Sequence, residues 1–317
     1  MTTQAIKCVA VIGTGVIGAS WASNFLAQGL SVRASDPAPD AEKRLQATVR
    51  ASWTVLDRMG LRPDASPDRL TFHALPEEAV AGADFIQESG PEQLELKRDL
   101  FRRLDAAADP RAVISTSSST IMPSEIQDAC ARHPERVVLG HPFNPPHLIP
   151  LVEVAGGRVT SPAAVETAIA FYRSIGKHPI HLKKEIRGHV ANRLQAALWR
   201  EAVHLVADGV ASVGDVDAAI AHGPGLRWAL LGPFVNLHLA GGPGGLAGLI
   251  EKPLWQAVQA MWADLDNSSG STPAVEAQLV AGVGESMGGL SMDAVARQRD
   301  DLLLGLLALK ARARDLP

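Results

Sequence analysis

The first half of the chain alternates between short, continuous apolar runs and longer segments of helical composition. The run Lys7–Ile12 is followed by a glycine, which is typical of a strand buried on both faces, and Val16–Gln28 then predicts a helix. Further strands are expected at Ser31–Ser35, Phe85–Gln87, Val113–Thr116, Val137–Leu139, Leu151–Val154 and Pro179–Leu182. Helices are expected between most of them, notably at Ala38–Met59, Leu94–Ala107 and Ala163–Ile175. This alternation predicts an α/β domain with a mostly parallel sheet.

The strand pattern stops after about Glu185. Val190–Asp208 has the spacing of one long amphipathic helix, and Met292–Arg314 predicts a closing helix. We therefore expect two domains: an α/β domain over residues 1–185 and a smaller all-α domain over residues 186–317.

Charge and composition exclude several classes of protein. The chain has 30 Lys and Arg against 34 Asp and Glu, so its formal charge of −4 offers no basic surplus for nucleic acid or an anionic membrane surface. No stretch approaches the roughly 18 apolar residues of a membrane span, and Gly13 interrupts the N-terminal apolar run too early for a signal peptide. Cys8 and Cys130 are too few for a disulfide framework or a cysteine-based zinc site. We expect a reducing, cytoplasmic location.

A glycine loop stands between the first predicted strand and the first predicted helix. Its sequence is Gly13-Thr14-Gly15-Val16-Ile17-Gly18, a G-x-G-x-x-G pattern. In this position the first glycine permits a tight turn, the second lets the backbone approach a pyrophosphate, and the third lets helix and strand pack closely. The pattern in this context predicts a Rossmann-type dinucleotide site, with a glycine turn that binds nothing as the alternative.

Asp36 directly follows the second predicted strand. A carboxylate at this place accepts hydrogen bonds from the adenosine ribose and repels a 2′-phosphate. Pro37 comes next, and no arginine stands there to receive NADP. We therefore expect NAD as the cofactor, although Asp36 could instead be only the cap of the following helix.

Polar side chains gather near the ends of later strands. The hydroxyl run Ser115–Thr120 follows one strand, and His141 follows another in the segment His-Pro-Phe-Asn-Pro-Pro. Glu153 stands between valines within a third strand, where a carboxylate is costly unless it is paired. An imidazole is an efficient partner because the carboxylate orients it and makes it more basic. Each residue alone could be structural, but together they predict a catalytic site.

These segments together resemble the L-3-hydroxyacyl-CoA dehydrogenase superfamily over essentially the whole chain. The resemblance rests on Gly13–Gly18, Asp36, Ile86–Lys97, Ser115–Thr120, the HPFNPP segment at His141, Pro150–Val154 and His189–Leu194. It is closest to the members that do not use CoA, L-gulonate 3-dehydrogenase (the lambda-crystallin group) and L-carnitine dehydrogenase.

The resemblance implies a role for several residues. His141 would be the general base that takes the hydroxyl proton, with Glu153 as its partner. Ser118 and Asn192 would bind the substrate oxygen, although Ser117 or Ser119 could take the place of Ser118. The remaining implied cofactor contacts are Glu92, Lys97 and Asn144. No metal is required, because the cofactor does the redox chemistry and the protein handles the proton.

The segment His222–Phe234 bears on the substrate. It places Arg227 and Trp228 where CoA-using members tend to have Tyr-Pro, and a guanidinium can bind a carboxylate through two hydrogen bonds. Arg227 could instead form an ordinary ion pair between domains. The segment Arg50–Arg69 is short and balanced in charge, unlike the basic arm of CoA-using members. We therefore expect a small free 3-hydroxy carboxylate as substrate.

The identity of that acid and the direction of the reaction stay open. An L-gulonate 3-dehydrogenase-like activity is the main interpretation, and L-carnitine dehydrogenase is the alternative, for which Phe143, Trp228 and Phe234 could surround a trimethylammonium group. A 3-hydroxybutyryl-CoA dehydrogenase and an NAD-binding crystallin-like protein are further alternatives. The aliphatic closing helix, together with the resemblance, predicts a homodimer formed through the helical domain.

Overall fold

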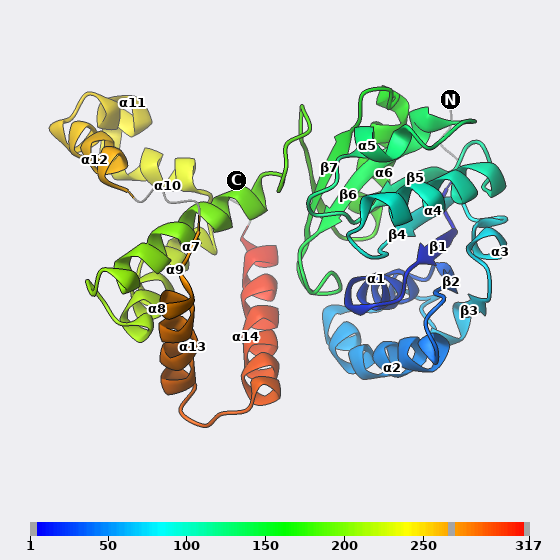
Figure 1. Cartoon of the computed structure of the whole chain (residues 1–317), viewed down its shortest axis with the longest axis horizontal. Coiled ribbons are helices and arrows are strands. Elements are labelled where there is room, and N and C mark those ends of the chain that lie inside the picture. The colour runs from blue at the N-terminus through cyan, green and yellow to red at the C-terminus, as the bar shows by residue number, and fades with distance from the viewer. Residues whose placement is uncertain (1–4, 266–269, 314–317) are drawn as a thin grey trace. The chain divides into compact units, whose positions relative to one another are not determined.

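The computed structural model describes residues 5–265 and 270–313 and divides the chain into two compact units between Arg193 and Leu194 (Figure 1). The expected domain boundary between residues 185 and 186 stays a prediction. The last residue of the expected closing helix, Arg314, lies outside the described residues.

The first unit is built on one eight-stranded sheet. Its strands, in the order β3-β2-β1-β4-β5-β6-β7-β8, are Leu70–His73, Ser31–Ser35, Cys8–Ile12, Phe85–Glu88, Val113–Thr116, Val137–Pro142, Leu151–Gly156 and His178–His181. Neighbouring strands are parallel except β6 and β7, which are antiparallel. The expected mostly parallel, Rossmann-type α/β fold is therefore confirmed. Because β1 pairs with both β2 and β4, the chain crosses over at this point, where α/β sheets bind their ligands.

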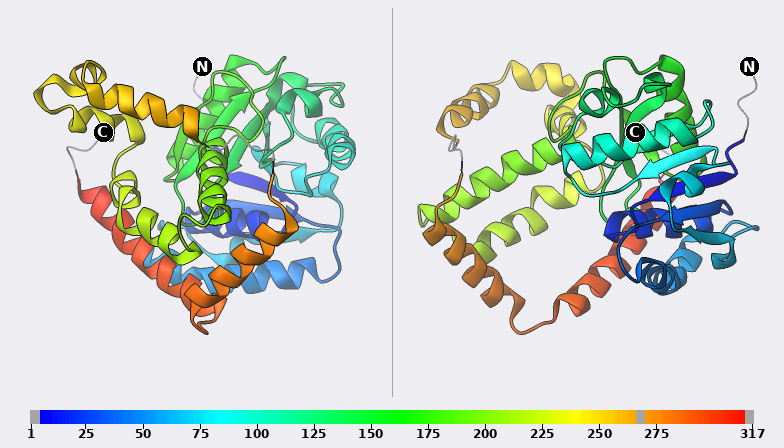
Figure 2. Two further views of the ribbon diagram at one scale, coloured as in Figure 1. Left: turned by 60° about the vertical axis from the view of Figure 1, so that its left-hand side comes forward. Right: turned by 45° about the vertical axis from the view of Figure 1, so that its right-hand side comes forward.

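Helices cover both faces of this sheet (Figures 1 and 2). The helices are α1 (Val16–Ala27), α2 (Ala41–Met59), α3 (Pro76–Val80), α4 (Leu94–Ala107), α5 (Pro123–Gln127) and α6 (Pro162–Ser174). Successive residues of a strand point to opposite faces, so Val9 and Val11 of β1 enter one core while Ala10 and Ile12 enter the other. Helices α1, α2 and α6 line the first core, and α3, α4 and α5 line the second. With both faces covered, the strands read as continuous apolar runs in the sequence.

The second unit is helical throughout its described residues. Its helices are α7 (Ala191–Ala207, which begins in the first unit), α8 (Val213–His222), α9 (Pro224–Trp228), α10 (Pro233–Ala240), α11 (Gly245–Ile250), α12 (Pro253–Asp264), α13 (Pro273–Met287) and α14 (Met292–Arg312). Few of its apolar side chains are buried, and large ones such as Trp199, Phe234 and Leu302 are more than half exposed.

Candidate active site

The glycine loop joins β1 to α1, and two of its glycines are required by close packing. Gly13 has φ +86°, and a Cβ there would lie 2.7 Å from the backbone carbonyl group of Ser89. A Cβ on Gly18 would lie 1.8 Å from the carbonyl oxygen of Gly13. Gly15 differs, because a Cβ there would meet nothing within 4 Å. The backbone at Gly15 is thus open to a ligand, as a pyrophosphate-binding turn requires.

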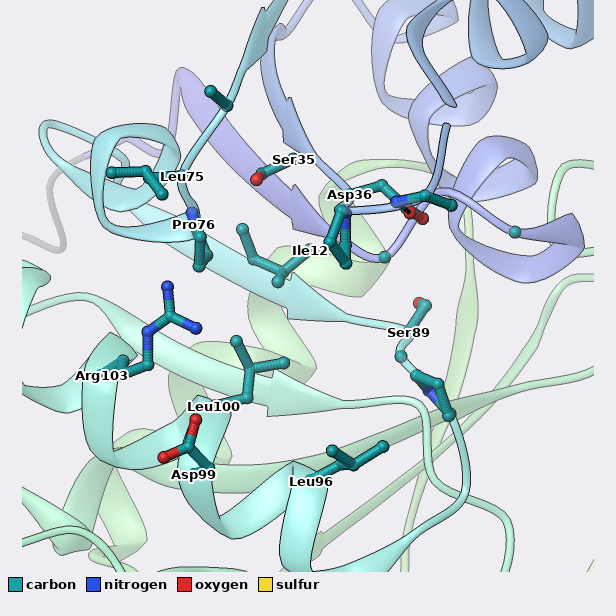
Figure 3. Close-up of a pocket in the computed structure, with 17 residues that line it drawn as sticks. Ile12, Ser35, Asp36, Leu75, Pro76, Ser89, Leu96, Asp99, Leu100 and Arg103 are labelled. Carbon is teal, nitrogen blue, oxygen red and sulfur yellow. Dashed lines mark hydrogen bonds between the residues drawn. The ribbon is translucent and has the colours of Figure 1, made fainter. Parts of the chain in front are cut away.

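A pocket of about 840 Å³ opens beside this loop at the ends of β1, β2 and β4 (Figure 3). Asp36 lies in its wall, where Oδ2 accepts hydrogen bonds from the amide of Thr14 at 2.7 Å and its hydroxyl at 3.1 Å. Oδ1 accepts from the amide of Ala38 at 2.8 Å. The nearby Arg33 donates instead to backbone carbonyls of α3. The open glycine turn and the fixed carboxylate fit the pyrophosphate and the adenosine ribose of NAD.

The far end of the pocket is largely apolar but also holds Asp99 and one ion pair. Leu75, Leu96 and Leu100 line it together with Arg103 (Figure 3). The guanidinium of Arg103 donates two hydrogen bonds, of 2.5 and 2.9 Å, to the carboxylate of Glu77. Glu77 thus neutralises the charge of Arg103 at this end of the pocket. An apolar chamber of this kind suits an adenine ring better than a phosphate.

Lys97 of α4, one of the expected cofactor contacts, forms a buried ion pair. Its Nζ lies 2.7 and 3.0 Å from the carboxylate oxygens of Glu88, which also accepts from the hydroxyl of Thr116 and the amide of Gly90, both at 2.6 Å. Both charged side chains are almost fully buried. Sequence reasoning missed Glu88, for which the signal was a carboxylate at the end of an otherwise apolar strand. The pair fixes the loop after β4, which borders the pocket.

Glu92 ties that loop to the hydroxyl run. Its Oε1 accepts from the hydroxyl of Ser118 at 2.6 Å, from the amide and hydroxyl of Thr120 at 2.7 and 2.8 Å, and from the amide of Ile121 at 3.2 Å. Burial alone would raise the pKa of Glu92, but the hydrogen bonds from Ser118 and Thr120 outweigh it, so the pKa lies below its ordinary value. The structure thus joins Glu92 to Ser118 directly.

The antiparallel pairing of β6 and β7 sets His141 opposite Glu153. Nδ1 of His141 donates to Oε2 of Glu153 at 2.9 Å, and Glu153 is fully buried. Burial tends to raise the pKa of Glu153, but hydrogen bonds from His141 and from the amides of Ala191 and Val190 lower it below its ordinary value. A carboxylate at Nδ1 leaves Nε2 of the neutral ring as an acceptor. That nitrogen can accept a hydrogen bond or a proton from a hydroxyl group.

Ser119, rather than Ser118, faces the base. Its hydroxyl lies 3.1 Å from Nε2 of His141, while the hydroxyl of Ser118 is engaged by Glu92. The choice among the three adjacent serines depends on the backbone of the loop, which the sequence alone does not define. Ser119, which the sequence offered only as an alternative to Ser118, is therefore the serine in contact with the base.

The remaining predicted residues differ in exposure and in the unit to which they belong. Asn192 is partly buried in the first turn of α7, directly after the two amides that Glu153 binds, and Asn144 is exposed on the loop after β6. Arg227 and Trp228 are exposed at the end of α9 in the second unit. Among residues 5–265 and 270–313, no three His, Cys, Asp or Glu side chains converge as a metal site, and no helix is long and apolar enough to cross a membrane.

Comparison with known proteins identifies the family of the chain. The family model for the 3-hydroxyacyl-CoA dehydrogenase NAD-binding domain matches residues 8–186, and the model for the C-terminal domain matches residues 188–268. The L-carnitine dehydrogenase of Pseudomonas putida is 47% identical over 302 residues, covering 95% of this chain and 93% of the relative. That of Streptomyces griseus is 47% identical over 307 residues, covering 97% and 91%.

Solved structures with a similar fold also include dehydrogenases of this family. The crystal structure of 5-formyl-3-hydroxy-2-methylpyridine 4-carboxylic acid 5-dehydrogenase, an NAD+-dependent dismutase, is 30% identical with a TM-score of 0.83, over 98% of this chain and 100% of that one. The 3-hydroxybutyryl-CoA dehydrogenase of Escherichia coli is 26% identical with a TM-score of 0.68, over 88% and 57%. The chain therefore belongs to the 3-hydroxyacyl-CoA dehydrogenase family and is an NAD-dependent dehydrogenase that acts on a CH–OH group.

Proposed function

We propose that this chain is an L-carnitine dehydrogenase, which oxidises the 3-hydroxyl of L-carnitine to a ketone. The observation that carries the proposal is the 47% identity, over 95% of the chain, to relatives of that name. It favours the alternative over the L-gulonate activity that the sequence analysis put first. The L-gulonate activity stays as a second candidate because HPFNPP and Asn192-Arg193-Leu194-Gln195 are more similar to that group.

The His141–Glu153 pair supplies the base for this reaction. Nε2 of His141 takes the hydroxyl proton while the carbinol carbon loses a hydride and becomes the carbonyl carbon. Glu153 stabilises the resulting imidazolium through the hydrogen bond at Nδ1. When bound, NAD supplies the hydride acceptor. Ser119, whose hydroxyl lies 3.1 Å from Nε2, takes the place of Ser118 in this proposal and holds the substrate oxygen together with Asn192.

The recognition of carnitine requires two further groups, one for each of its charges. We assign its carboxylate to Arg227, whose charge is permanent and whose guanidinium can donate two hydrogen bonds. The trimethylammonium group would favour aromatic faces, for which Phe143, Trp228 and Phe234 are the candidates. Phe143 lies edge-on to His141, with ring centroids 5.8 Å apart.

The test is to measure the rate of NADH formation, by absorbance, with a panel of substrates. It compares L-carnitine, D-carnitine, L-gulonate, L-3-hydroxybutyrate and 3-hydroxybutyryl-CoA at equal concentrations with saturating NAD. We expect kcat/KM for L-carnitine to exceed that for L-gulonate by roughly 30-fold or more, since a desolvated cation–π contact is worth about 2 kcal/mol or more and L-gulonate lacks the cation. A higher kcat/KM for L-gulonate or for the CoA thioester would overturn the assignment.

We also propose that the chain forms a homodimer through its second unit and works in the cytoplasm. A monomer would expose apolar side chains there that include Met292 at 82% and Leu302 at 71%. Apolar surface of this extent is typical of an interface. Light scattering at micromolar concentration should give twice the chain mass of 33.5 kDa, and a monomer would contradict the proposal.

A further inference from the structure

A second histidine lies against the catalytic pair and has no role in the reaction described above. His189 is 1% exposed, and its ring centroid lies 4.9 Å from that of His141. Its Nε2 lies 2.9 Å from the carbonyl oxygen of Ser118. This contact joins the hydroxyl run after β5 to the segment that leads into α7. His189 thus bridges two parts of the site that are far apart in the sequence.

The backbone at His189 has an unusual conformation. Its φ is +52°, in the left-handed region that favours glycine, and among the described residues only Asp40 shares this feature without being glycine. Such a conformation is unfavourable for a bulky side chain and persists only where the surroundings hold it. The next two amides, of Val190 and Ala191, both donate to Oε1 of Glu153, at 2.8 and 3.0 Å. The turn at His189 therefore aims two successive amides at the carboxylate.

Glu153 consequently has two tasks. One oxygen holds His141, and the other binds the amides at the start of α7, where the positive end of the helix dipole favours an anion. Asn192 is the next residue along α7. Any movement of the turn at His189 would shift Asn192 relative to His141 and would also disturb the carboxylate that orients the base.

The protonation state of His189 fits this arrangement. Burial lowers its pKa, so the ring is neutral near pH 7, and a carbonyl partner requires the hydrogen to be on Nε2. A neutral ring adds no positive charge beside His141. The imidazole therefore acts as a hydrogen-bond donor and a packing partner rather than as a second base.

We propose that His189 is a positioning residue, which by its hydrogen bond to Ser118 holds the turn that sets Asn192 and Glu153 against His141. The proposal deepens the function proposed above and rests on it for the identity of the substrate. His189 contacts neither substrate nor cofactor in this account. Its effect passes through the neighbouring groups.

Two variants separate the hydrogen bond from the volume of the ring. His189→Phe keeps a ring but loses the donor, whereas His189→Gln keeps an N–H group at a similar reach. His178→Phe, at an exposed histidine at the start of β8, is the matched control. Since a misplacement of about 1 Å can cost about 100-fold, we expect His189→Phe to lower kcat/KM for L-carnitine by roughly 10- to 100-fold. His189→Gln should recover most of the loss, and the control should match the wild type.

The dissociation constant for NAD distinguishes positioning from general damage. The pocket beside Gly15 and Asp36 shares no lining residue with the turn at His189, so NAD affinity should stay within about twofold in every variant. Wild-type kcat/KM in His189→Phe would overturn the proposal. Equal losses in the Phe and Gln variants, accompanied by weaker NAD binding, would also overturn it, because they would show a purely structural role.

Hydrogen exchange at the amides of Val190 and Ala191 tests the same idea without any substrate. We expect exchange there to accelerate by about 10-fold or more in His189→Phe, because the turn opens locally, and to return towards the wild-type rate in His189→Gln. Unchanged exchange would refute the proposal. If exchange responds but L-carnitine is not oxidised, the proposed function fails while the role of His189 stands, and kinetics are then measured on the hydroxy acid that the wild type does oxidise.

Discussion

Replacing Glu153 with glutamine puts an amide group where both carboxylate oxygens now accept hydrogen bonds. Three N–H groups point at this side chain: Nδ1 of His141 at 2.9 Å, and the amides of Val190 and Ala191 at 2.8 and 3.0 Å. Glutamine offers one oxygen. If that oxygen faces the amides, the side-chain NH2 faces Nδ1, and the imidazole must move its hydrogen to Nε2. In that tautomer Nε2 no longer accepts the substrate proton.

The magnitude follows from the buried position of the group. The variant loses a charge-assisted hydrogen bond worth about 1.5–3 kcal/mol and leaves a buried donor or acceptor mismatched at a further cost of about 1–3 kcal/mol. At 1.36 kcal/mol per decade, a combined loss of about 3–5 kcal/mol corresponds to roughly 10²- to 10⁴-fold in kcat. The same range applies to the loss of a general base as a whole. We therefore expect Glu153→Gln to lower kcat by nearly the same factor as His141→Ala.

The assay is steady-state kinetics on L-carnitine across pH, with Glu166→Gln on the exposed face of α6 as the control. We expect kcat to fall by the factor given above at every pH, and NAD affinity to stay nearly constant. A Glu153→Gln enzyme with kcat within about fivefold of the wild type would refute the reasoning. An imidazole with its hydrogen on Nε2 cannot accept the substrate proton, so such a high activity would not remain.

Three further changes test separate parts of the structure. Asp36→Ala should weaken NAD binding by roughly 10- to 100-fold and reduce the preference for NAD over NADP, measured as the ratio of the two kcat/KM values. A wild type that uses both cofactors equally well would contradict this. Burial lowers the pKa of Lys177 from 10.5 to about 7. Between pH 7 and pH 10.5, Lys177 is therefore protonated in the unfolded chain but neutral in the folded chain. Stability should therefore rise with pH across this window by at most about 1.4 kcal/mol per unit, and Lys177→Met should lose that rise in urea unfolding; parallel curves for the two proteins would refute it. Arg227→Met should lower kcat/KM by roughly 30- to 1000-fold and abolish the preference for the free acid over its methyl ester, whereas an unchanged acid-to-ester ratio would make Arg227 structural.

The fold was predictable from the sequence because its main signals are local. Strands buried on both faces give continuous apolar runs, and the steric demands on Gly13 and Gly18 leave a glycine pattern at fixed spacing. The edge strand β3, Leu70–His73, was missed because it is only partly buried and mixes polar with apolar residues. Short helices such as α5, with five residues, carry too little periodicity to be recognised.

The site was predictable in its residue types but not in its geometry. A carboxylate between valines required a partner, and the structure places Glu153 against His141, while the catalytic roles of both stay predictions. The Glu88–Lys97 pair and the contact of Ser119 with Nε2 depend on loop conformations that no spacing rule gives. The left-handed turn at His189 leaves no sign in the sequence, because glycine is the residue expected there.

The central claim is that His141 is the base of an NAD-dependent 3-hydroxy acid dehydrogenase. The most direct measurement is the rate of NADH formation from L-carnitine by the wild type and by His141→Ala, with NAD affinity measured in parallel. The account predicts that the wild type turns over and that kcat falls by roughly 10²- to 10⁴-fold in the variant, while NAD binds to both nearly equally. Wild-type turnover by His141→Ala would contradict it.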